Sequence, residues 1–123
     1  MTTGDAIERL RRLCLALPEA HERVTFGGPT FRVREKIFAM PRDRDGRPSV
    51  WMKAPPHSQG ILVGADPERF FVPPYVGPKG WIGMRLDAEP DWTEVEALVR
   101  RSYRLIAPKR LGALLPDPPP GGV

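Results

Sequence analysis

The spacing of apolar residues near the N-terminus has the period of a helix. Four apolar residues recur there at helical intervals: Ile7, Leu10, Cys14 and Leu17. This spacing predicts a helix that begins near Thr3 and buries that face. Either Thr2 or Asp5 is predicted to cap it, because the pairs Thr2/Asp5 and Asp5/Glu8 both have the spacing of a capping box. Pro18 ends it.

The middle of the chain alternates between apolar and polar residues, which is typical of half-buried strands. Three strands are predicted over residues 30–34, 37–40 and 49–53. The polar segment 41–48, with Asp45-Gly46 at its centre, is predicted to be a hairpin loop. A short helix over residues 57–65 precedes two further strands over residues 69–72 and 81–86.

The last helix has the clearest boundaries. Asp91 is predicted to cap it, Glu94 to complete a capping box, and Pro108 to end it. Its buried stripe consists of Val95, Leu98, Val99, Ser102 and Ile106. The element order predicts an α+β fold, a two-layer α-β(3)-α-β(2)-α arrangement in which the helices cover one face of an antiparallel sheet. We expect one domain over residues 1–115 and a disordered Pro/Gly-rich tail over residues 116–123.

The other face of such a sheet is predicted to be more open. Alternation places six residues on it: Arg32, Arg34, Trp51, Lys53, Trp81 and Arg85. Gly83 leaves a gap between the last two. The tryptophans would stack on nucleobases, while the basic residues, with Lys79, would meet phosphates. The competing interpretation is structural, in which the same side chains pair across strands and cover a wet sheet face.

Composition agrees with a small cytoplasmic domain. The chain has 123 residues, of which 41% are hydrophobic and 28% charged, and its net charge of +4 favours anionic partners only mildly. No signal peptide or membrane-spanning stretch is predicted, so we expect no membrane partner. The single cysteine, Cys14, favours a reducing compartment.

Candidate chemistry is sparse. His21, His57 and Cys14 do not have the spacing of metal ligands, and an acidic segment beginning at Asp43 lacks the glycine position and final ligand of a calcium loop. Cys14 lies on the apolar face of its helix, where a nucleophile would be buried. No motif for a phosphate-binding loop or a nucleophilic serine is present. The sequence therefore predicts no catalytic residues, no metal, no cofactor and no enzymatic activity.

Several motifs resemble the MmcQ/YjbR family over roughly residues 10–111. They are Leu17-Pro18-Glu19-Ala20, Phe26-Gly27, Phe31-Arg32-Val33, Lys36-Ile37-Phe38-Ala39, the segment 66–77, Gly80-Trp81-Ile82-Gly83, Ser102-Tyr103 and Ala107-Pro108-Lys109. The resemblance implies the same α-β(3)-α-β(2)-α fold, which is similar to that of secretion chaperones. Members often have glycine where this chain has Glu35, which implies a different turn. The family is commonly labelled DNA-binding, and Lys36 and the Lys79–Trp81 turn are the matching positions to test.

The sequence leads to three alternative hypotheses for the function. The first is a DNA-binding module that uses Arg32, Arg34, Lys36, Trp51, Lys53, Lys79, Trp81 and Arg85. The second is a protein-interaction or chaperone-like module, with a protein partner or a second copy of the chain on the face that bears Trp51 and Trp81. The third is a small-molecule binder with a pocket near Tyr75, Trp81 and Arg85.

Overall fold

The computed structural model describes residues 2–44, 46–87 and 89–116. Its helices are α1 (Thr3–Leu15), α2 (Ser58–Ala65), the 3-10 turn η1 (Gly77–Lys79), α3 (Trp92–Ile106) and α4 (Lys109–Gly112). Its strands are β1 (His21–Thr25), β2 (Gly28–Val33), β3 (Lys36–Arg44), β4 (Arg47–Met52), β5 (Phe70–Phe71) and β6 (Ile82–Arg85). They form one antiparallel sheet in the order β1-β2-β3-β4-β6-β5.

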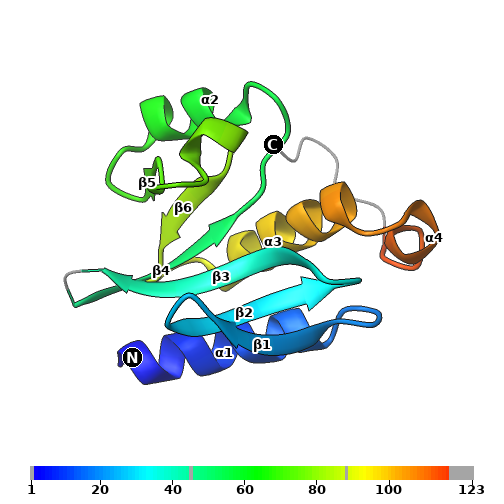
Figure 1. Cartoon of the computed structure of the whole chain (residues 1–123). Coiled ribbons are helices and arrows are strands. Elements are labelled where there is room, and N and C mark those ends of the chain that lie inside the picture. The colour runs from blue at the N-terminus through cyan, green and yellow to red at the C-terminus, as the bar shows by residue number, and fades with distance from the viewer. Residues whose placement is uncertain (1, 45, 88, 117–123) are drawn as a thin grey trace.

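Two helices cover one face of this sheet. Helix α1 contacts β2, β3 and β4, and α3 contacts β3 and β4. Figure 1 shows both helices on the same side of these strands, with α2, β5 and β6 forming the upper part of the molecule. The predicted α+β class, with helices on one side of an antiparallel sheet, is confirmed.

The core between the helices and the sheet is apolar, and specific side-chain contacts connect its elements. Phe38 of β3 meets Tyr103 of α3 edge to face, with ring centroids 5.3 Å apart, a preferred aromatic geometry. The Tyr103 hydroxyl donates to the carbonyl of Pro18 at 2.6 Å, which joins α3 to the segment after α1. Cys14 is fully buried on the inner face of α1, as its spacing predicted.

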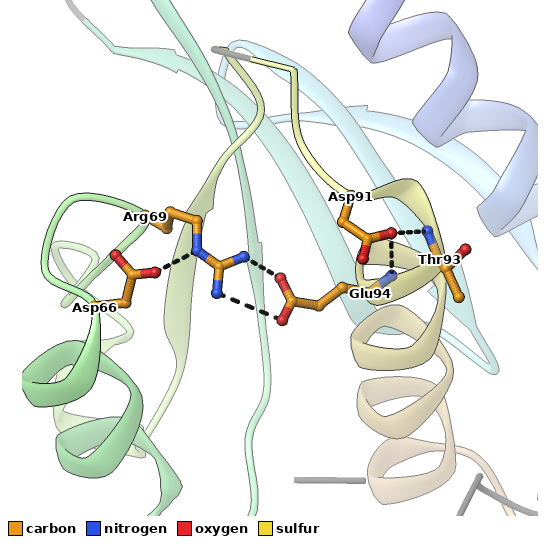
Figure 2. Close-up of polar contacts among 5 residues, drawn as sticks. All are labelled: Asp66, Arg69, Asp91, Thr93 and Glu94. Atoms are coloured by element: carbon orange, nitrogen blue, oxygen red, sulfur yellow. Dashed lines mark hydrogen bonds and ion pairs between the residues drawn. The ribbon is translucent and has the colours of Figure 1, made fainter.

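The two predicted helix caps have different outcomes. Thr2 and Asp5 form the reciprocal capping box at the start of α1. At α3, the Asp91 carboxylate accepts hydrogen bonds from the backbone N–H groups of Thr93 and Glu94 (Figure 2). The Glu94 side chain, predicted to close the box, instead pairs with Arg69. A charge-assisted pair with a guanidinium is stronger than a bond to one backbone N–H, which accounts for the difference.

Arg69 therefore links α3 to the turn after α2. Its guanidinium bonds both Glu94 and the Asp66 carboxylate, the latter at 2.5 Å (Figure 2). Its hydrogen bonds to these carboxylates raise the pKa of Arg69, and Glu94 contributes more than Asp66. The ion pairs attach the α2–β5 segment to the start of α3.

Two parts of the sheet differ from the predicted pattern. Strand β1 was not predicted, because its only large apolar residue, Val24, is an exposed side chain on an edge strand. The predicted loop over residues 41–48 is wrong, because β3 and β4 remain paired there: Pro41 lies opposite Val50, and Asp43 opposite Pro48. Backbone pairing, rather than apolar side chains, extends this ribbon to a turn that includes Gly46; Asp45 lies outside the described residues.

The β2–β3 turn corrects the position of Arg34. Val33 pairs with Lys36, so Arg34 and Glu35 are the two turn residues, with φ values of 51° and 69°. Arg34 therefore lies outside the strand, and its guanidinium pairs with Glu19 at 3.1 Å. Glu35 adopts the left-handed region of φ, which glycine adopts without strain.

Candidate nucleic-acid interface

The sheet face opposite the helices is defined by the strand register. Cross-strand partners share a face, and the pairs Arg32–Ile37, Met40–Trp51 and Trp51–Gly83 follow one another across the sheet. Arg42–Ser49 and Ser49–Arg85 make a second row on the same face. This surface, which we call the basic face, brings together three arginines from β2, β3 and β6: Arg32, Arg42 and Arg85.

The centre of the basic face is apolar and closed. Trp51 and Trp81 are each only 8% exposed, and they pack with Met40 and with the partly buried Ile37, Phe71 and Val76. The prediction that both tryptophans lie exposed on an open face is therefore wrong. A segment near the sheet edge supplies the cover: Val76, just before η1, packs against them, and Gln59 of α2 donates to the carbonyl of Trp81 at 2.7 Å. The indole Nε1 of Trp51 has no hydrogen-bond partner among the described residues.

The gap predicted at Gly83 is filled by an aromatic ring. Phe71 pairs directly with Gly83, and a Cβ at Gly83 would lie 2.3 Å from the Phe71 ring. Arg85 stacks on the same ring, with its guanidinium carbon 4.8 Å from the centroid. Its Nε donates to the carbonyl of Glu68 at 3.1 Å.

The other two arginines converge on Thr25, the last residue of β1. Arg32 Nη2 donates to the Thr25 hydroxyl at 3.0 Å, and Arg42 Nη2 donates to the Thr25 carbonyl at 3.3 Å. Arg32 is also held by the Thr30 hydroxyl and the Glu35 carbonyl, and Arg42 by further backbone carbonyls. Burial lowers the pKa of Arg42.

Acidic residues neutralise other cations around this face. Glu35 pairs with Arg23 at 3.1 Å, and Asp87 pairs with Arg47 at 2.6 Å. In the part of the chain that the structure describes, the guanidinium groups of Arg32, Arg42 and Arg85 form no salt bridge. Their hydrogen-bond partners in that part of the chain are neutral groups.

Of the remaining predicted residues, one lies on the opposite face, and the other two lie outside the strands that define this surface. Lys36 lies opposite Val33, whose side chain is in the helix-side core, so it lies on the other face from Arg32. Lys53 follows β4, and its backbone N–H donates to Ser102. Lys79 is exposed in η1.

The predicted small-molecule pocket between Tyr75 and Trp81 is also not formed. Tyr75 is 90% exposed, whereas Trp81 is buried, so the two do not make facing walls. A cavity of about 580 Å³ lies elsewhere, between α1 and α3. Its charged lining is balanced: Asp5, Glu8, Glu96, Arg9, Arg12 and Arg100. That balance gives no preference for anions.

Sequence reasoning missed Arg42 and Thr25. Arg42 was assigned to the loop after Met40, although alternation continued through Pro41 would have placed it on the basic face. Thr25 was missed because β1 has no alternating apolar pattern. Among the described residues, no cluster of three or more potential ligands could hold a metal ion, and no helix is long and apolar enough to cross a membrane.

These features define a small α+β domain in which helices cover one face of a six-stranded antiparallel sheet and arginines line the other. The chain belongs to the YjbR family, whose model matches residues 15–105. The crystal structure of Deinococcus radiodurans protein DR2400, described as a DUF419 domain, is similar to this chain, with a TM-score of 0.74 and 24% identity over 95% of this chain and 94% of that one. That likeness shows the fold. A comparison with curated proteins found no match.

Proposed function

We propose that the chain is a nucleic-acid-binding module, for DNA in particular, and that it binds through the basic face. The observation that carries this proposal is the set of three arginines, Arg32, Arg42 and Arg85, on one face without carboxylate partners. Guanidinium groups bind phosphate through charge-assisted and often bidentate hydrogen bonds. Three such groups, spread over β2, β3 and β6 of one sheet face, match a repeating phosphate backbone better than a single small anion.

The buried tryptophans change the expected mode of contact. Trp51 and Trp81 maintain the shape of the face, so they do not stack on bases as the sequence pattern suggested. Binding then depends mainly on phosphate contacts, which give affinity and a strong dependence on salt.

The test compares two variants that lose the same charge. One carries Gln in place of Arg32, Arg42 and Arg85, and the control carries Gln in place of Arg12, Arg100 and Lys109 on the helices. Fluorescence anisotropy with labelled DNA should show a lower affinity for the first variant and a log–log salt slope smaller by about 1 for each lost phosphate contact. The control should stay close to wild type.

Two outcomes would contradict the proposal. One is no binding by the wild-type chain at micromolar concentration in low salt. The other is equal weakening by the two triple variants, because that result would show an effect of net charge alone. Circular dichroism melting of each variant separates lost binding from lost folding, which matters because Arg42 holds several backbone carbonyls.

A second candidate is a protein-interaction module built on α2. This helix has no fully buried residue, and Ile61 on it is 63% exposed. Sedimentation of the wild type and an Ile61→Glu variant tests self-association. A monomer at all concentrations would count against a second copy as the partner.

A further inference from the structure

The tip of the β1–β2 hairpin has an unusual residue. Thr25 pairs with Gly28, so Phe26 and Gly27 form a two-residue loop, and their φ values are 59° and 81°. Positive φ at both positions is the conformation of a type I′ turn, which favours Asn, Asp or Gly at the first position. A phenylalanine there is strained, and strain at an ordered position is a reason to look for function.

The Phe26 side chain is also 79% exposed. It is absent from both apolar clusters of the described residues. Its ring therefore gains little from folding, although it occupies a position that another residue would fill with less strain. An exposed ring with a free face is suited to stacking on a flat partner.

The two converging arginines contact the residue that precedes this ring in the chain. Both donate to Thr25, the residue before Phe26, from β2 and β3. Gly28, the first residue after the turn, makes room for one of them: a Cβ there would lie 3.0 Å from Arg42 Nη1. The hairpin thus combines an exposed aromatic tip with two cations at its base.

Donors remain available on both guanidinium groups. Arg32 uses three hydrogen bonds, whereas a guanidinium has five N–H donors. The Nε of Arg42 makes no hydrogen bond among the described residues. A phosphate could therefore bind without breaking the contacts that position these side chains.

We propose that Phe26, Arg32 and Arg42 form a nucleotide subsite for single-stranded nucleic acid, in which an unpaired base stacks on Phe26 and its phosphate binds the two arginines. This inference rests on the proposed function and specifies its substrate. Stacking on the Phe26 ring requires an exposed flat face of a base. In a duplex the neighbouring base pairs cover that face. Single strands expose it.

The experiment measures anisotropy with a labelled single-stranded oligothymidylate and with its duplex. The variants are Phe26→Asn and Phe26→Ala, and Tyr75→Ala is the matched control, because Tyr75 is another exposed aromatic residue with positive φ. Loss of one stacked base should raise Kd for the single strand about tenfold or more, with little change for the duplex. The Tyr75 variant should stay close to wild type.

Two further readouts separate stacking from folding and from charge. Phe26→Asn should melt at or above the wild-type temperature, because Asn tolerates the left-handed region. It should also keep the wild-type salt slope, whereas Arg42→Gln should reduce that slope by about 1. Weaker binding by a chain that is equally or more stable cannot come from unfolding.

The outcomes distinguish this inference from the broader proposal. Equal or tighter binding of the duplex with no effect of the Phe26 variants would overturn the subsite and leave nucleic-acid binding in place. Equal losses from the Phe26 and Tyr75 variants would also overturn it. If the wild-type chain bound neither form, both proposals would fail together.

Discussion

The ring of Phe71 lies directly over Gly83, its cross-strand partner on the neighbouring strand. A Cβ at position 83 would come within 2.3 Å of the ring, so only glycine fits beneath it. This contact closes the sheet face that the sequence pattern left open beside Trp51 and Trp81. It also provides the ring on which Arg85 stacks.

We expect Gly83→Ala to destabilise the protein by about 1–3 kcal/mol, because overpacking forces the ring and its neighbours to shift. Urea unfolding measures the change. In a Phe71→Ala background the same substitution should cost much less, since the two residues are in contact. Gly60→Ala in α2 is the control, because a Cβ there meets nothing within 4 Å; it should stabilise the helix by about 0.5–1 kcal/mol. Similar losses at both glycines would contradict this account.

Ser102 joins α3 to β3 and to the residue that follows β4. Its fully buried hydroxyl donates to the Phe38 carbonyl at 2.7 Å and accepts from the Lys53 N–H at 2.9 Å. Ser102→Ala leaves both backbone groups unsatisfied, so the free energy of unfolding should fall by about 1–3 kcal/mol. Thr93→Ala, at an exposed position in the same helix, should change it little. A neutral result at Ser102 would show that the Phe38 carbonyl and the Lys53 N–H find other partners.

The Arg47–Asp87 pair predicts a stability difference that depends on pH. Hydrogen bonds from Arg47 hold the pKa of Asp87 below its usual 3.8. A carboxyl group with a depressed pKa stabilises the fold above its unfolded pKa, and the contribution is lost as pH falls through the lower, folded pKa. Wild type should therefore exceed Asp87→Asn in stability at neutral pH, and the gap should shrink below pH 3.8.

Denaturant titrations at neutral and acidic pH measure this gap. Asp43→Asn is the control, because Asp43 makes no ion pair among the described residues. A gap that stays constant through the acidic range would mean that Asp87 acts through something other than its charge.

Cys14 should be unreactive in the folded protein. It is completely buried, and burial raises the pKa of its thiol, so almost no thiolate forms at neutral pH. Ellman's reagent should label it slowly in native buffer, at a rate set by opening of the fold, and at once in guanidinium chloride. Rapid labelling in native buffer would show that α1 separates easily from the core.

Local pattern was sufficient where a residue's environment depends on near neighbours. The spacing of Leu10 and Cys14 determined the buried face of α1, and alternation determined the main strands. Capping-box spacing narrowed the cap of α1 to Thr2 or Asp5, and the structure has Thr2. These features repeat within one or two turns of helix or a few strand positions, so the sequence itself contains the signal. The fold class follows from their order.

Tertiary structure decided what the sheet face became. Trp51 is buried because β4 pairs with β6, which brings Gly83 and the Phe71 ring beside it. Arg32 and Arg42 converge because β1 lies outside β2, and β1 has no apolar alternation by which to predict it. These contacts join residues far apart in the chain through strand order and register, which periodicity does not encode. The sequence therefore determined a domain with a basic sheet face, and the register decided which of its cations and rings remain free to bind.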